Sequence, residues 1–86
     1  MPTLFFTSSF SRRVKRLEPE LQEEVLLKID WFRNPKNWGQ LKVHKLGGKL
    51  KSYYSSSVNY KIRTVFRYLS KNEIVLVAIG DHDIYK

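Results

Sequence analysis

The sequence predicts an α+β domain in which two N-terminal helices pack on one face of a small, twisted antiparallel sheet, in the order β-α-α-β-β-β. Apolar residues recur at helical spacing between positions 10 and 32, alternate with polar residues between 60 and 69, and run without interruption from 74 to 79. A chain of 86 residues with 42% hydrophobic content can form one compact core, so we expect a single domain over residues 1–86.

The first quarter of the chain predicts a strand followed by a helix. Residues 4–7 are short, apolar and bounded by polar residues, which is typical of a strand. Ser8 or Ser9 can cap the helix that follows, because a serine hydroxyl accepts a hydrogen bond from the first helical turn. Its apolar face is expected to consist of Phe10, Val14 and Leu17.

A second helix is predicted after the break at Glu18-Pro19-Glu20, since proline is tolerated in a first helical turn. We expect it to end near Asn34, because Pro35 disfavours helical geometry in the residue before it, and a loop to follow as far as residue 39. Glu24 and Lys28 are expected to pair on its solvent side, and Trp31 and Trp38 to be structural. Its inner face consists of Leu21, Val25, Ile29 and Phe32.

The second half of the chain predicts three strands. Residues 41–50 have no clear pattern beyond a turn at Gly47-Gly48, and residues 51–58, rich in Ser and Tyr, predict an outer, solvated strand. Asn59 predicts a turn. Residues 60–69 alternate, and residues 73–79 form an apolar run typical of a strand covered on both faces, with a hairpin loop at 70–72 between the two.

Alternation in the strand at 60–69 divides its side chains between two faces. One face carries Tyr60, Ile62, Thr64, Phe66 and Tyr68. If the helices cover that face, the other face is a basic and partly open concavity formed by Lys61, Arg63 and Arg67, with Val65 between them. The last strand should end beside it and bring His82 and Tyr85 to the same place.

The excess positive charge is local. The stretch from 41 to 68 contains seven of the sixteen Lys and Arg residues and no acid, which leaves nine basic residues against all eight acids in the rest of the chain. A net charge of +8 predicts an acidic partner, which leaves nucleic acid, an anionic membrane or an acidic protein as candidates. A phosphate backbone suits such a surface because each contact releases a condensed counterion.

Several classes of function are poorly supported. The chain has no cysteine, two histidines with no zinc-ligand spacing, and no glycine-rich phosphate loop, so no metal or cofactor is expected. The start of the chain lacks the pattern of a signal peptide, and no apolar run approaches the roughly 20 residues that span a bilayer. We therefore expect a cytoplasmic protein without a membrane partner.

The sequence resembles the RelE/ParE toxin superfamily of toxin–antitoxin systems in three motifs that occur in the same order. The motifs are LGGKL at 46–50, YKIRTVF at 60–66 and IGDHDIY at 79–85. The resemblance covers nearly the whole chain and implies the same α+β fold. For the RelE branch it also implies a ribosome-dependent endoribonuclease that cuts mRNA in the ribosomal A site and is neutralised by a cognate antitoxin. The C-terminal motif departs from the family's longer spacing, because Tyr85 lies only three residues after His82.

The resemblance implies catalytic roles for Arg63, His82 and Tyr85. Metal-independent cleavage by the RNA's own 2′-OH needs a base, an acid and cations at the phosphate. His82 can supply acid or base and Arg63 a phosphate clamp, whereas Tyr85 can equally stack on a base or anchor the C-terminus. The alternatives without a catalytic role are that His82 is an ordinary turn residue and that Arg63 is a strand residue exposed to solvent. The expected RNA-binding residues are Lys42, His44, Lys45, Lys49, Lys51, Lys61 and Arg67. His44 is also a second candidate base. The alternative for the lysines is a run of charged side chains exposed to solvent.

Two other functions fit the same residues. A ParE-like toxin would inhibit DNA gyrase without cutting RNA, and such a protein has no evident need for the His82 and Tyr85 tail. A non-toxic RNA-binding module would use the basic stretch alone.

Overall fold

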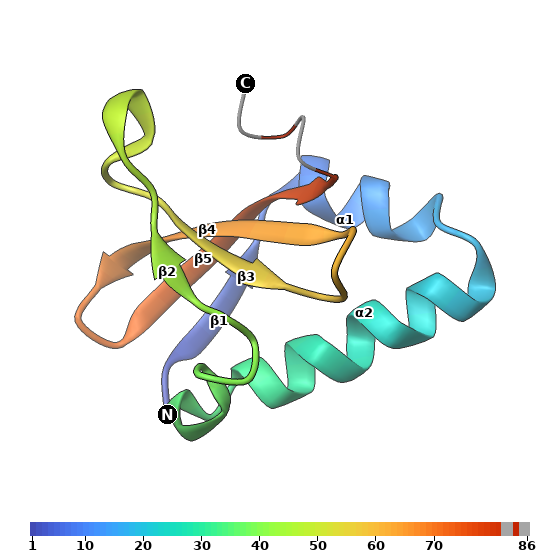
Figure 1. Ribbon diagram of the computed structural model, residues 1–86, viewed down its shortest axis with the longest axis horizontal. Coiled ribbons are helices and arrows are strands. Elements are labelled where there is room, and N and C mark those ends of the chain that lie inside the picture. Colours follow the sequence, from blue (N-terminus) through green and yellow to red (C-terminus); the bar gives the residue numbers. More distant parts are fainter. Residues whose placement is uncertain (82–83, 85–86) are drawn as a thin grey trace.

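A computed structural model describes residues 1–81 and residue 84, so His82 and Tyr85 lie outside the described residues. Two helices, α1 (Ser8–Lys15) and α2 (Pro19–Phe32), follow the first strand and precede the rest of the sheet (Figure 1). Two short 3-10 turns, η1 (Pro35–Asn37) and η2 (Gly48–Leu50), lie in the connections. The strands are β1 (Thr3–Phe6), β2 (His44–Lys45), β3 (Tyr54–Ser57), β4 (Arg63–Ser70) and β5 (Glu73–Gly80).

The strands form one sheet in the order β1-β5-β4-β3-β2, which confirms the predicted α+β class. The pairs from β2 to β5 are antiparallel, as expected. The β1–β5 pair is parallel, which the prediction of an antiparallel sheet did not include. The two helices follow β1 and separate it in sequence from the other strands. A connection of this length allows β1 to pair in parallel with β5, which a short hairpin turn does not.

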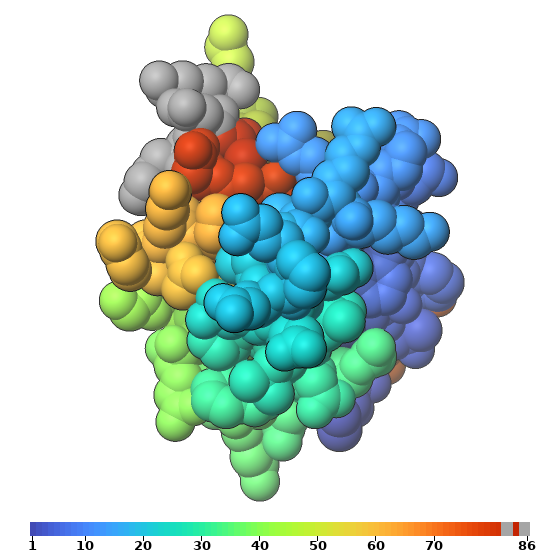
Figure 2. All heavy atoms as spheres, turned by 90° about the vertical axis from the view of Figure 1, so that its right-hand side faces the viewer, coloured from blue at the N-terminus to red at the C-terminus, as the bar shows by residue number. Residues whose placement is uncertain are grey.

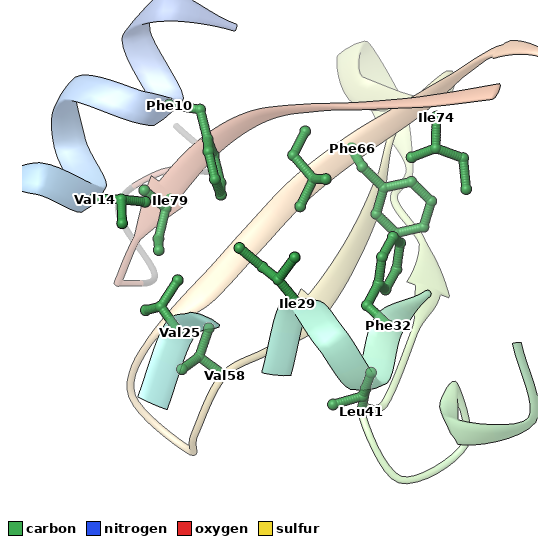
Figure 3. Close-up of a cluster of buried hydrophobic side chains, with 11 residues drawn as sticks. Phe10, Val14, Val25, Ile29, Phe32, Leu41, Val58, Phe66, Ile74 and Ile79 are labelled. Carbon is green, nitrogen blue, oxygen red and sulfur yellow. The ribbon is translucent and has the colours of Figure 1, made fainter. Parts of the chain in front are cut away.

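The hydrophobic core lies between one face of this sheet and the helices (Figure 3). Phe66 of β4 is fully buried, and its ring centroid lies 4.8 Å from that of Phe32 on α2 and 5.3 Å from that of Tyr54 on β3. Trp38 stacks on Phe32 at 5.1 Å and donates from Nε1 to the Phe32 carbonyl, so its expected structural role is confirmed. The side chains of α1 and α2 cover this side of the molecule (Figure 2).

The N-cap of α1 and the side-chain contacts of α2 differ from the prediction. Thr7, one residue before the serines, is the N-cap of α1, and its hydroxyl accepts from the Phe10 amide at 3.1 Å. The expected surface pair of Glu24 and Lys28 is wrong, because both reach the turn between β3 and β4. Lys28 Nζ donates to the Val58 carbonyl at 2.7 Å, and Glu24 accepts from Asn59, which holds this turn against α2 (Figure 1).

Two strand predictions also need correction. The strand at 51–58 contracts to β3 and is not solvated, since Ser55 and Ser56 are buried and β2 pairs along its outer edge. The strand at 60–69 begins only at Arg63, so Lys61 lies in the preceding bend and Tyr60 is 87% exposed instead of facing the core. Asn59 causes this shift, because its side chain accepts from the amides of residues 61 and 62 and extends the turn.

No helix within the described residues is long and apolar enough to cross a membrane. The same part of the chain contains no cluster of His, Asp or Glu side chains that could hold a metal ion.

Candidate nucleic-acid interface

Arg63 and Arg67 share the face of β4 that points away from the helices. Pairing with β5 shifts register between Val65 and Phe66, and the extra residue there lies in β5, so the alternation within β4 is not interrupted between the two arginines. Phe66, on the opposite face, packs against Phe32 of α2. The covered and open faces are therefore those that the alternation predicted.

His44 joins the same face through the short strand β2. It pairs with Ser55 of β3, which pairs in turn with Val65 of β4, and directly paired residues point to one side of a sheet. Its Nδ1 lies 2.9 Å from the Lys42 carbonyl oxygen. Since a carbonyl only accepts, this contact holds a proton on Nδ1 and leaves Nε2 of the neutral ring with its lone pair.

The centre of this face is a floor of buried side chains instead of an open basic hollow. Ser55 is 0%, Val65 5% and Val75 8% exposed. Arg67 and His44 are exposed on either side of the floor, and Arg63 is half-buried at the start of β4. The cations therefore lie around a small patch of buried side chains.

Arg63 is held in place by the turn that precedes it. Its Nη1 donates to the Asn59 carbonyl, and the Asn59 side chain is itself fully engaged. Oδ1 of Asn59 accepts from the amides of Lys61 and Ile62 at 2.9 and 2.8 Å, while Nδ2 donates to Glu24 at 2.7 Å. The sequence predicted Asn59 only as a turn residue, and its role in positioning Arg63 depends on α2, which no local pattern reveals.

The predicted RNA-binding lysines do not all lie on this face. Lys45 pairs with Tyr54, whose ring stacks on Phe66, so Lys45 points to the opposite side of the sheet from His44. Lys49 and Lys51 are exposed in the excursion between β2 and β3, which projects beyond the sheet on the side away from α2 (Figure 1). Lys42 and Lys61 are exposed in the segments that flank Arg63 and His44.

The C-terminal motif approaches the site through Gly80. Gly80 pairs with Arg63, so the end of β5 lies directly beside the half-buried arginine. Ile84 turns back over Gly80, and its Cγ2 occupies the space that a Cβ at position 80 would need. A side chain at position 80 would therefore displace Ile84.

No protein-family model matches the sequence, and comparison with curated proteins finds no match. Solved structures with a similar fold include a YoeB/ParE toxin from Agrobacterium tumefaciens, with a TM-score of 0.74 and 21% identity over 95% of this chain and 99% of that one. The toxin–antitoxin complex RelBE2 from Mycobacterium tuberculosis has a TM-score of 0.71 and 18% identity, covering 95% of this chain and 100% of that one. The heterotetrameric YoeB–YefM toxin–antitoxin complex from Staphylococcus aureus has a TM-score of 0.71 and 20% identity, covering 95% and 98%.

The chain thus has the same fold as these solved toxin structures, which is the fold that the resemblance of the three sequence motifs implied. The coverage includes essentially the whole chain, so both helices and the sheet belong to the common architecture. A fold alone does not specify an activity, which has to be argued from the side chains on the open face.

Proposed function

We propose that this protein is the toxin of a type II toxin–antitoxin system and cleaves mRNA in the ribosomal A site. The observation that supports this best is that His44, Arg63 and Arg67 lie on the same face of a RelE-type sheet, the face away from the helices. Cleavage uses the 2′-OH as nucleophile, so the protein's task is to position a phosphate and move two protons.

Arg63 is the proposed clamp for the phosphorane oxygens. Its guanidinium is anchored at one nitrogen by the Asn59 carbonyl, which leaves further N–H groups for a bidentate contact with phosphate. Anchoring lowers the entropy lost when the phosphate binds, because the side chain is already ordered. Arg67 and the exposed lysines at 42, 49, 51 and 61 hold the RNA backbone.

His44 and His82 are the proposed proton-transfer pair. The contact of His44 Nδ1 with the Lys42 carbonyl leaves Nε2 to remove the proton from the 2′-OH. His82 is two residues after Gly80, which pairs with Arg63, and lies outside the described residues. It is proposed as the acid that protonates the leaving 5′-oxygen, with Tyr85 contributing a stacking surface or a proton.

The proposed partner is an antitoxin with an acidic, strand-forming or helical segment. Two of the similar structures are toxin–antitoxin complexes. The net charge of +8 favours an acidic partner, and β1 is an edge strand whose outer side can pair with an added strand.

Induced expression without antitoxin, followed by primer extension along an abundant mRNA, tests this proposal. We expect growth arrest and cuts phased with codons for the wild type, and loss of both for His44→Ala, His82→Ala and Arg63→Ala. Lys71→Ala is the matched control, because Lys71 is an exposed cation in the turn at the other end of β4. Arrest without cuts would refute the nuclease and favour a ParE-like gyrase inhibitor, while normal growth would favour a non-toxic RNA-binding module.

A further inference from the structure

A small hollow lies where β3 ends and β4 begins, between the turn at 58–62 and the second half of α2. Its volume is about 180 Å³, which is below the range of pockets for drug-sized ligands and suits one planar ring system. Ten residues from three parts of the chain line it, including Lys28 and Trp31 of α2, Lys42 before β2, and Tyr60 and Arg63 after β3.

Two aromatic rings in this hollow are accessible. Tyr60 is 87% exposed and Trp31 39% exposed, although both types of side chain are usually well covered in a folded domain. The turn that carries Tyr60 is held on either side of it, because Asn59 Oδ1 accepts from the amides of Lys61 and Ile62 and Asn59 Nδ2 donates to Glu24 on α2. An exposed ring on a fixed turn loses little conformational entropy when a flat ligand stacks on it.

The charge in the hollow is uniformly positive. Lys28, Lys42 and Arg63 line it, and none of the ten lining residues is acidic. Lys28 Nζ lies 5.5 Å from the centre of the Trp31 ring and donates to the Val58 carbonyl, so this cation is held beside the aromatic ring. Cations that alternate with accessible rings are the combination that binds single-stranded nucleic acid.

The hollow adjoins two parts of the proposed cleavage site. Arg63 is a lining residue and also the proposed phosphate clamp. Lys42 is a lining residue, and its carbonyl makes the contact with His44 Nδ1. A nucleotide whose phosphate reaches Arg63 therefore has this hollow as its nearest recess.

From this geometry we propose that the hollow is a subsite for one unpaired RNA base next to the cleaved phosphate. The base stacks on Tyr60 and Trp31, and Lys28 and Lys42 contact the flanking phosphates. The position of the base relative to the cut rests on the proposed nuclease function, whereas the binding of single-stranded RNA in the hollow does not.

Tryptophan fluorescence tests the subsite directly. The probe is a five-nucleotide RNA with 2′-O-methyl groups, which cannot be cleaved by 2′-OH attack. We expect it to quench wild-type emission, and Trp31→Phe to lose that quenching, because Trp38 is packed against Phe32 in the core. Inorganic phosphate at equal charge should leave the emission unchanged, and quenching by phosphate to the same extent would overturn a base-stacking site.

Tyr60 supplies a variant that does not threaten folding, since its side chain is almost fully exposed. Tyr60→Ala should weaken the affinity for the pentanucleotide by about five- to 150-fold, the usual effect of removing one stacked ring. Tyr60→Phe keeps the ring and should restore affinity to within about twofold, and Lys71→Ala should bind as the wild type does. Equal affinity of Tyr60→Ala and the wild type would overturn the subsite.

The outcomes for the subsite and for the nuclease are separable. Quenching by RNA without any mRNA cleavage would support the subsite and refute the nuclease. Cleavage at wild-type rates by Tyr60→Ala, with no quenching by RNA, would refute the subsite alone. Quenching by an acidic, aromatic peptide from a cognate antitoxin, with none by RNA, would instead identify the hollow as a protein contact and overturn the proposal.

Discussion

Asn59→Asp should destabilise the protein, although the substitution only replaces the side-chain NH2 group with an oxygen. The Asn59 amide nitrogen lies 2.7 Å from a Glu24 carboxylate oxygen, and both residues are half-buried. In the variant, an oxygen replaces the nitrogen, so a donor–acceptor contact becomes a contact between two carboxylates. The two amides that Asn59 Oδ1 accepts from keep an acceptor, which confines the change to the contact with α2.

The cost can be worked out from the geometry. Two unit charges at the present 2.7 Å separation repel by about 1.5 kcal/mol even at the dielectric constant of water. Loss of the hydrogen bond adds about 1 kcal/mol. Some of the repulsion is relieved by rotation of Glu24, and partial burial strengthens what remains, so we expect a loss of about 2–3 kcal/mol in the free energy of unfolding.

A double-mutant cycle with Glu24→Gln isolates this contact. The glutamine amide can donate to the new carboxylate at position 59, so the double variant should recover most of the lost stability, with a coupling energy of about 2 kcal/mol. Urea denaturation at pH 7 measures all four proteins, and mRNA cleavage reports whether Arg63 is released along with the turn. If Asn59→Asp were as stable as the wild type, or if Glu24→Gln failed to rescue it, the tethering of this turn to α2 would be refuted.

Three further predictions concern other parts of the fold. Thr7→Ala should lower the free energy of unfolding by about 1 kcal/mol through loss of the cap on the Phe10 amide, and Thr7→Ser should not; equal melting temperatures would contradict this. Gly80→Ala should reduce the proposed mRNA cleavage because a Cβ meets Ile84, and Ile84→Ala in the same chain should restore it; loss that persists in the double variant would argue against the steric cause. Burial, followed by the charge of Tyr54, raises the pKa of the Tyr68 phenol above 10.0, so the unfolded phenol ionises first and the stability should fall as the pH rises past 10. Denaturation curves for Tyr68→Phe should lack that fall.

Local signals in the sequence predicted the elements that bury apolar side chains. The helical spacing of Val25, Ile29 and Phe32 predicted α2 and its buried face, and the uninterrupted apolar run predicted β5. The face of β4 that carries Arg63 and Arg67 also followed from alternation. Each of these inferences depends on a side-chain period that one segment imposes by itself.

Predictions failed where polar side chains reach across the fold. Ser55 and Ser56 suggested a solvated strand, yet both are buried because β2 covers the outer edge of β3. Lys61 and Tyr60 were assigned to a strand, but Asn59 extends the turn through hydrogen bonds to two amides and to Glu24.

Periodicity and composition are sufficient to predict the α+β class, the helical hairpin, the covered face of the sheet and the local excess of positive charge. The position of His44 on the same face as Arg63 and Arg67 is visible only in the folded sheet, since it depends on the pairing of a two-residue strand. The parallel β1–β5 pair and the tether from Asn59 to α2 likewise join residues distant in sequence. Such contacts form only once the chain has folded, and no local pattern encodes them.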